Sequence, residues 1–155
     1  MTLSDLDTEL LLCKKYLDGS KNPPPEIEFY LTQFFIIRIC GEYEKEIKRI
    51  VNERAATSSD HELASFVSSR LEVFKHLDMK SLRGNVLKKF SIRCLSSFND
   101  IIKNKQPEIS YTSIVSNRHS IAHGGSINLT LRELIEAHSY AKQVLVALSA
   151  VLSKT

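Results

Sequence analysis

The sequence predicts an all-α protein, an up-and-down bundle of five to six helices in which sequential neighbours run antiparallel. Three observations support this fold class. Apolar residues recur at helical spacing over most of the chain, no segment alternates with period two for long, and the breaks between apolar stripes are short. The 155 residues are enough for one domain with a sizeable core, and no internal repeat divides them.

The first predicted helix covers residues 1–19, with Ser4 as its cap and Gly19 as a left-handed stop just past its end. Its apolar positions at helical spacing are Leu6, Leu10 and either Tyr16 or Leu17. Residues 20–25 contain three successive prolines, which exclude a helix and predict an extended connector. The main bundle is then expected over residues 26–155.

The second predicted helix runs about thirty residues from Glu26 without a proline, and Gly41 is its one weak point. Its apolar set is Phe29, Phe34, Ile37, Tyr43, Ile47, Ile50 and Val51. The first half is apolar nearly all round, whereas the second half is charged on most faces. We therefore expect the start of this helix to lie in the core and its end to project.

Asp60 is placed to cap a third helix, whose apolar positions are Leu63, Phe66, Val67, Leu71 and Phe74. Two apolar stripes follow between residues 79 and 103, and either Ser91 or the Ser96–Ser97 pair divides them. Pro107 is expected to close this segment.

The last two helices are predicted after residue 107. One apolar stripe consists of Tyr111, Ile114, Val115 and Ile121 and stops at Gly124–Gly125. Thr130 and Glu133 then have the spacing of a capping box ahead of a final helix that is rich in Leu, Ala and Val.

Composition and charge exclude several classes of protein. A hydrophobic fraction of 43% and a charged fraction of 25% exclude a disordered, collagen-like or low-complexity chain. The net charge of +3 permits RNA as a partner without demanding it. Cys13, Cys40 and Cys94 form no CxxC pair and the N-terminus lacks a secretory signal, so we expect a reduced, cytoplasmic protein. No apolar run is long enough to span a membrane.

The segment that concentrates the most residues able to take part in catalysis or binding is residues 115–125, VSNRHSIAHGG. It gathers Asn117, Arg118, His119, Ser120 and His123 at the predicted end of a helix. The apolar stripe of that helix faces the core, so the polar set is expected to face a cleft or a partner.

Each of these residues also has a purely structural interpretation. A histidine beside glycine at a helix end is favoured by the helix dipole, so His123 alone proves little. Arg118 and Asn117, taken singly, are ordinary surface residues. His119 and His123 have the i,i+4 spacing of metal ligands, but no glutamate or cysteine motif completes a metal site, so neither a metal nor another cofactor is predicted.

Arginine and histidine together suit cleavage of RNA by its own 2′-hydroxyl. A guanidinium binds phosphate oxygens with a fixed fork of donors, and an imidazole can accept and release protons near neutral pH. The reaction needs a base, a charge clamp and an acid. A symmetric dimer that brought two copies of this helix end together would place two His and two Arg around one phosphate, without a metal.

The chain resembles the HEPN domains (higher eukaryotes and prokaryotes nucleotide-binding), and within them the RiboL-PSP-HEPN group. The resemblance covers residues 27–152 and is carried by Arg118 and His123, an Arg-x4-His motif followed by Gly124, together with the long second helix and the capped last helix. It implies a single HEPN-type domain over residues 1–155.

The resemblance also implies a homodimeric, metal-independent endoribonuclease. His123 would transfer protons, Arg118 would hold the scissile phosphate and His119 would assist, with Asn117 and Ser120 as substrate contacts. Glu44 falls where related domains often carry an acidic residue, although Glu42 and Glu46 are also candidates. In the commonest form of the group's motif an Asn follows the Arg. Here Asn117 precedes Arg118 and His119 follows it, which leaves open which side chain assists catalysis.

Three hypotheses remain open. The first is a ribonuclease that cleaves single-stranded RNA, as a toxin or defence effector restrained by a separately encoded antitoxin protein. The second is a catalytically inactive HEPN-like dimer that binds RNA or a protein partner. The third is a helical adaptor in which the Arg-x4-His spacing is a coincidence.

Overall fold

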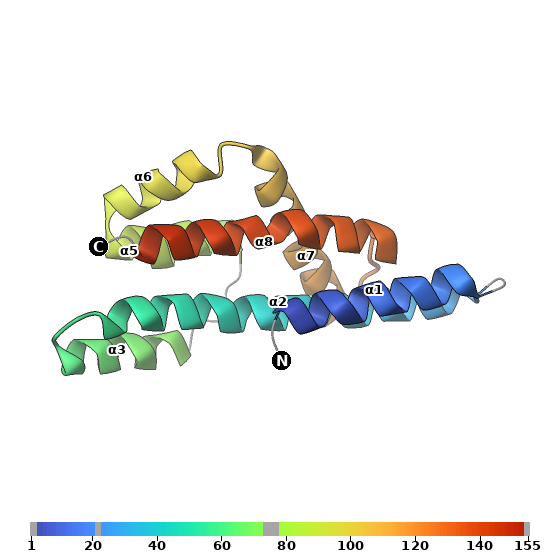
Figure 1. Cartoon of the computed structure of the whole chain (residues 1–155), viewed down its shortest axis with the longest axis horizontal. Helices are drawn as coiled ribbons and strands as arrows, with labels where there is room; N and C mark the ends of the chain where they lie inside the picture. The colour runs from blue at the N-terminus through green and yellow to red at the C-terminus, as the bar shows by residue number, and fades with distance from the viewer. Residues whose placement is uncertain (1–2, 21–22, 73–77, 154–155) are drawn as a thin grey trace.

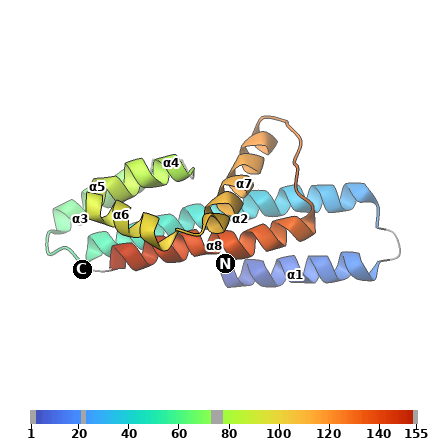
Figure 2. The ribbon, with the colours of Figure 1, turned by 90° about the horizontal axis from the view of Figure 1, so that it is seen from above.

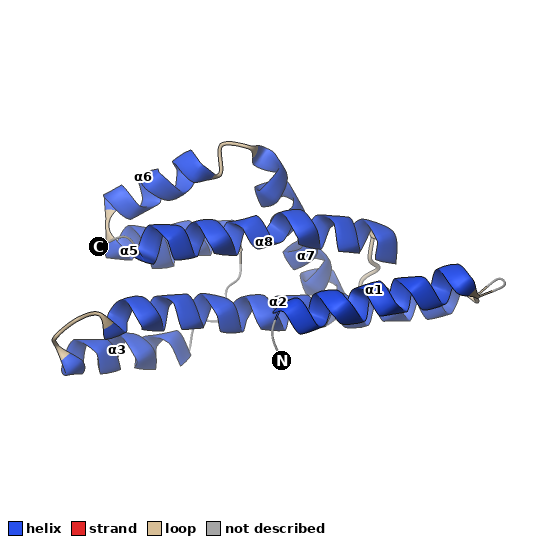
Figure 3. Ribbon diagram, in the orientation of Figure 1, coloured by secondary structure: helices blue, strands red, loops and turns tan. Residues whose placement is uncertain are grey.

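A computed structural model of the chain describes residues 3–20, 23–72 and 78–153, and all the regular structure in these ranges is helical (Figure 1, Figure 3). The elements are α1 (Leu3–Gly19), α2 (Pro25–Ala56), α3 (His61–Glu72), α4 (Met79–Ser81), the π-helix η1 (Leu82–Leu87), α5 (Lys88–Phe90), α6 (Ile92–Ile101), α7 (Lys105–Ala122) and α8 (Leu131–Ser153). The predicted all-α fold is confirmed. Because α4, η1 and α5 follow one another without a gap, the described ranges form seven helical segments, more than the five to six expected.

Two long helices, α2 and α8, form the centre of the molecule. α1 lies antiparallel beside the first half of α2, and α3 folds back antiparallel along its second half (Figure 1). α8 runs in the same direction as α2, because the chain returns to it through α7, which crosses both helices obliquely (Figure 2). The continuous segment α4–η1–α5 runs opposite to α3, and α6 reverses direction again (Figure 1, Figure 2). The antiparallel order of sequential helices therefore holds from α1 to α6 and is broken by α7.

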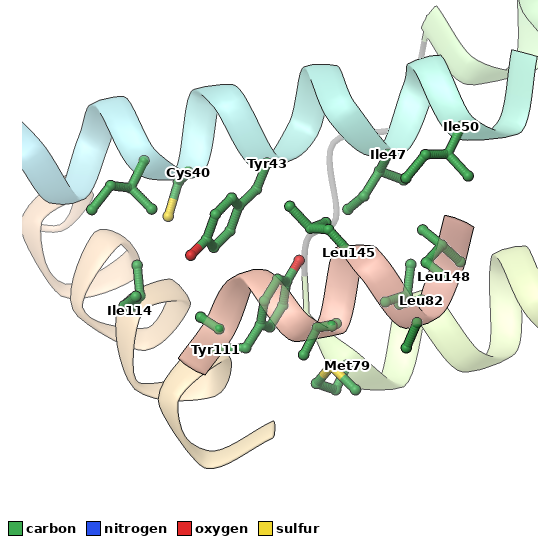
Figure 4. Close-up of a cluster of buried hydrophobic side chains, with 14 of the residues drawn as sticks. Cys40, Tyr43, Ile47, Ile50, Met79, Leu82, Tyr111, Ile114, Leu145 and Leu148 are labelled. Carbon is green, nitrogen blue, oxygen red and sulfur yellow. The ribbon is translucent and has the colours of Figure 1, made fainter. Parts of the chain in front are cut away.

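The core lies where α2, α7 and α8 meet (Figure 4). Tyr43 and Ile47 of α2, Tyr111 and Ile114 of α7, and Leu148 of α8 are all almost completely buried. Full burial of one such side chain contributes about 1.5–3 kcal/mol. This packing holds α7 against α2 and so positions the far end of α7.

The burial of α2 differs from the sequence prediction in its first half. Tyr43, Ile47, Ile50 and Val51 are buried as expected, but Phe29, Phe34 and Ile37 are exposed. The residues that face the core instead are Thr32, Phe35, Ile36, Ile39 and Cys40. This half is apolar nearly all round, so the helical period alone could not choose the buried face. The expectation that the end of α2 projects was also wrong, since α3 and α8 pack against it.

Several helix ends are where their local signals place them. An oxygen of Asp60 accepts from the backbone N–H of Leu63 at 3.0 Å, as predicted for a cap. Ser91 is the divider of the 79–103 segment: its backbone is extended and its Oγ accepts from the N–H of Cys94 at 3.0 Å. Thr130 and Glu133 form the predicted capping box, with the Thr130 N–H 2.8 Å from Glu133 Oε2.

Other helix ends differ from prediction. α1 already includes Ser4 and Gly19, and Gly19 has no positive φ, so neither residue is the expected cap or stop. Pro107 does not close α6 but lies in the first turn of α7, where a helix leaves its N–H groups unpaired in any case. Leu63 and Phe66 of α3 are exposed rather than packed, and Phe74 lies outside the described residues.

None of the helices in the described part of the chain combines the length and apolar character that crossing a bilayer requires.

Candidate functional site

The end of α7 is a hydrogen-bonded turn built on two glycines. The N–H of Gly124 donates to the Ile121 carbonyl at 3.1 Å, and the N–H of Gly125 donates to the Ser120 carbonyl at 2.8 Å. This pair of bonds is the Schellman motif. Gly124 has a φ of +72°, and a Cβ on Gly125 would lie 3.1 Å from the Ser120 oxygen, so both positions favour glycine. The turn holds His123 at a defined place on the helix end.

Three of the predicted catalytic side chains share this helix end and are exposed: Arg118, His119 and His123. The ring centroids of His119 and His123 are 4.4 Å apart, with the rings edge to face at 61°. The structure thus presents two imidazoles side by side, and an exposed arginine precedes them on the same helix.

Arg118 also faces α2. Burial raises the pKa of the Cys40 thiol to about 12, and the nearby positive charge of Arg118 opposes this rise. Cys40 itself is a buried, unreactive thiol. Among the described residues no carboxylate lies within ion-pair distance of Arg118. Its positive charge therefore acts on the α2 side of the helix end and is available for an anionic ligand.

Asn117 is buried, in contrast to its exposed neighbours. Its Nδ2 donates to the Ser113 carbonyl at 2.9 Å, and its Oδ1 accepts from the N–H of Asn128 at 3.0 Å. The side chain thus ties the connection between α7 and α8 to α7. The expectation that the whole polar set is presented at the surface was wrong for Asn117, because both of its polar atoms are used within the chain.

Ser120 is half-buried at the base of the same turn. Its Oγ donates to the Ser116 carbonyl at 3.2 Å, and its own carbonyl accepts from Gly125. Its hydroxyl is thus bonded within its own helix, and the residue remains partly accessible.

Glu44 is half-buried on α2, one helical turn beyond Cys40. It accepts a hydrogen bond from Lys48 Nζ at 2.7 Å. Glu42 and Glu46 are bonded in the same way, to Lys45 and Arg49. All three acidic candidates on α2 thus pair with basic residues three or four positions along their own helix.

The sequence analysis did not identify a polar cluster in which Tyr43 and His138 are buried and Asp7 and Lys142 are partly exposed. The hydroxyl of Tyr43 is 2.7 Å from Nδ1 of His138, and Nε2 of His138 is 3.2 Å from Asp7 Oδ1, within ion-pair reach but without the alignment of a hydrogen bond. Lys142 Nζ lies 2.6 Å from the other oxygen of Asp7. The cluster joins α1, α2 and α8.

The protonation of this cluster follows from burial. Burial lowers the pKa of His138 to about 4; the Asp7 charge opposes this effect and the Lys142 charge adds to it. Burial also raises the pKa of Tyr43 well above its usual value. Tyr43 therefore donates to Nδ1 of a neutral imidazole, whose own proton lies on Nε2. The Tyr43 ring stacks on Tyr111 of α7 at 5.3 Å, which connects the cluster to the helix that bears the site.

The residues of the site lie on an open surface. Three cavities, of about 710, 630 and 410 Å³, are lined by other residues. In the described part of the chain, no three His, Cys, Asp or Glu side chains gather closely enough to hold a metal ion.

Comparison with known proteins gives one result. The family model named RiboL-PSP-HEPN matches residues 2–154, so the match includes both the end of α7 and all of α2. No curated protein and no solved structure matches the chain.

Proposed function

Because the chain belongs to the RiboL-PSP-HEPN family, we propose that it is an endoribonuclease that cleaves single-stranded RNA without a metal ion. The family indicates an RNA-related or nuclease role and dimerisation in general terms. The observation that supports the finer proposal is the exposed group of Arg118, His119 and His123, which a glycine turn holds at the end of α7.

The proposed reaction is transesterification within the RNA chain. One imidazole takes the proton of the 2′-hydroxyl, whose oxygen attacks the neighbouring phosphorus. Arg118 donates to the nonbridging oxygens as negative charge develops on them. The bond from phosphorus to the 5′-oxygen breaks, and that oxygen receives a proton from an imidazolium. The products are a 2′,3′-cyclic phosphate and a free 5′-hydroxyl.

One chain does not supply this chemistry in an enclosed site, since its Arg–His group lies on an open surface. We infer that two copies form the working site as a homodimer, with His123 as the proton-transfer residue, Arg118 as the phosphate ligand and His119 assisting. Asn117 would contribute by holding the neighbouring connection in place, and Ser120 and Glu44 are weaker candidates for contact. The biological setting we propose is a cytoplasmic toxin or defence effector controlled by an antitoxin protein.

The test is cleavage of a long single-stranded RNA in excess chelator, with end-group analysis of the products. We expect cleavage by the wild type and a loss of about 100-fold or more in His123→Ala and in Arg118→Ala. His61→Ala is the matched control, because His61 is an exposed histidine at the start of α3. Arg118→Lys keeps the charge but loses the donor fork, so its cleavage rate should lie between those of the wild type and Arg118→Ala.

Inactivity of the wild type on varied RNAs would contradict the proposal, as would activity that survives His123→Ala or that appears only when a metal ion is added. The open surface around the Arg–His group also suits a second function, an RNA-binding or protein-interaction module without catalysis. Equal RNA binding by the wild type and His123→Ala, with no cleavage by either, would favour that function.

A further inference from the structure

α2 carries a continuous apolar stripe on the face that points away from the core. Ile27, Tyr30, Phe34 and Ile37 are 45%, 66%, 49% and 51% exposed, and Gly41 extends the row as an exposed glycine. We name these five residues the α2 seam. The seam is on the order of 20 Å long, since fourteen helical steps of 1.5 Å separate its ends.

The spacing of the seam is that of a helix that packs against another helix. Its positions are separated by three, four, three and four residues, which is the a/d pattern of a two-helix seam. The opposite face of the same half of α2 already fills the core with Phe35, Ile36 and Ile39. The seam is therefore a second apolar face, and contiguous apolar patches of this kind on a protein surface mark interaction sites.

Gly41 gives an independent indication of a close neighbour. A Cβ added at this position would meet nothing within 4 Å, so nothing within the described part of the chain requires a glycine here. A glycine inside an exposed helix costs about 1 kcal/mol relative to alanine. Its presence is explained if the side chain of another helix occupies the space above it.

The seam lies between two flanks of α2. On one flank Arg38 pairs with Glu9 of α1. On the other, Cys40 faces α7, which packs against α2 and carries Arg118, whose charge acts on Cys40 (Figure 4). Residues two apart on a helix point about 160° away from each other, so these flanks are on nearly opposite sides. Figure 2 shows α1 and α7 on the two sides of α2.

We propose that a second copy of the chain packs on the α2 seam, with the two α2 helices antiparallel around a two-fold axis. In this arrangement Phe34 of each copy faces Ile37 of the other, and Tyr30 of each copy faces Gly41 of the other.

Side-chain size supports the antiparallel direction. Facing layers pack well when a large residue meets a small one, as Tyr30 and Gly41 do here. Parallel helices would place Gly41 against Gly41, which leaves a gap, and Tyr30 against Tyr30, which crowds the next layer. Parallel helices would also place the exposed Lys45 of one copy against Lys45 of the other just beyond the seam, where the two positive charges repel each other.

The antiparallel direction also determines where the two copies of α7 lie. A two-fold axis perpendicular to the paired helices keeps the α7 flank of both copies on the same side, whereas a parallel pair would put them on opposite sides. In this pairing Cys40 of one copy is level with Leu31 of the other. The two Cys40 residues, which mark the α7 flank, would therefore be nine helical steps, or about 14 Å, apart along the helices. This part of the inference rests on the proposed function: both Arg–His groups would face one RNA strand, and neither copy alone would complete the site.

The first experiment measures self-association by sedimentation equilibrium without RNA. We expect the wild type to be a dimer at about 10 μM and Phe34→Glu to weaken the dimer by about 100-fold or more, with an unchanged helical circular dichroism spectrum. Val146→Glu is the matched control on α8, because Val146 is 67% exposed and lies outside the seam. A monomeric wild type, or a Phe34→Glu protein that dimerises as well as the wild type, would overturn the proposal.

The second experiment tests direction with a short bis-maleimide crosslinker, in chains with Cys13 and Cys94 changed to Ser. A mixture of Tyr30→Cys chains and Gly41→Cys chains should crosslink to each other. Gly41→Cys alone should not, because its two copies would be about 17 Å apart along the helices. Efficient crosslinking of Gly41→Cys to itself would establish a parallel pair and overturn the proposal.

Cleavage separates the inference from the function on which it rests. Phe34→Glu should lose RNA cleavage and Val146→Glu should retain it. A monomeric Phe34→Glu that cleaves at the wild-type rate would overturn the shared site. A wild type that dimerises through the seam but cleaves no RNA would support the seam and contradict the proposed ribonuclease.

Discussion

The buried imidazole of His138 should make the stability of the fold depend on pH from about 6.5 downward, beginning above the range in which carboxyl groups titrate. In the folded chain the pKa of His138 is about 4, against 6.5 for a free histidine, because burial disfavours the charged ring. The unfolded chain therefore binds a proton first as the pH falls. The stability contributed by the neutral ring is complete above pH 6.5 and is lost as the pH falls from 6.5 through 4.

The magnitude follows from the size of the shift. One pKa unit corresponds to 1.36 kcal/mol, so the full loss is on the order of 3 kcal/mol, and about 2 kcal/mol of it falls between pH 6.5 and 5. Among the described residues, the carboxyl groups that hydrogen bonds hold below their usual pKa of 4.5 are those of Glu46, Glu108 and Glu133. Their contributions are lost only below about pH 4.5, so the higher window isolates His138.

The assay is urea unfolding at pH 7.5 and pH 5, followed by circular dichroism at constant protein concentration. The wild type should lose about 2 kcal/mol between the two values, and His61→Ala should lose the same. The His138→Asn side chain can still accept a hydrogen bond from Tyr43 but cannot be protonated. The free energy of unfolding of this variant should therefore differ little between pH 7.5 and pH 5. A wild type whose free energy of unfolding is the same at both pH values, or an Asn variant that loses as much as the wild type, would refute this account of the cluster.

Four further predictions concern single positions. Tyr43→Phe should destabilise the fold by about 1–3 kcal/mol in urea unfolding, because it leaves a buried ring nitrogen unpaired. Tyr111→Phe should be neutral or slightly stabilising, since the buried Tyr111 hydroxyl has no hydrogen-bond partner among the described residues. Gly124→Ala should cost about 1 kcal/mol because of its positive φ, and should lower RNA cleavage by displacing the neighbouring histidine; full activity with a lowered melting temperature would contradict the second effect. Asn117→Ala should lower the free energy of unfolding by about 1–3 kcal/mol, and a melting temperature equal to that of the wild type would contradict its assigned role.

The sequence by itself determined the fold class and the helix ends that depend on nearby residues. The caps at Asp60 and Ser91 and the capping box at Thr130 each join atoms only three residues apart. The bonds of the turn at Gly124 likewise join residues three and five apart. Such bonds join residues that are close in sequence, so a local pattern predicted these ends, whereas the same kind of signal was wrong at Ser4 and Gly19 of α1. The Arg-x4-His group was found for the same reason.

Tertiary structure alone decided which apolar face of α2 is buried and which polar side chains are used inside the chain. Phe34 and Phe35 are equally apolar, and only the positions of α1, α7 and α8 turn one outward and the other inward. Tyr43 meets His138 across 95 residues of sequence, and each lies within an otherwise apolar helical stripe. The burial of a side chain, and the pKa of a buried group, depend on all the helices that pack around it. A local sequence pattern does not specify which helices these are.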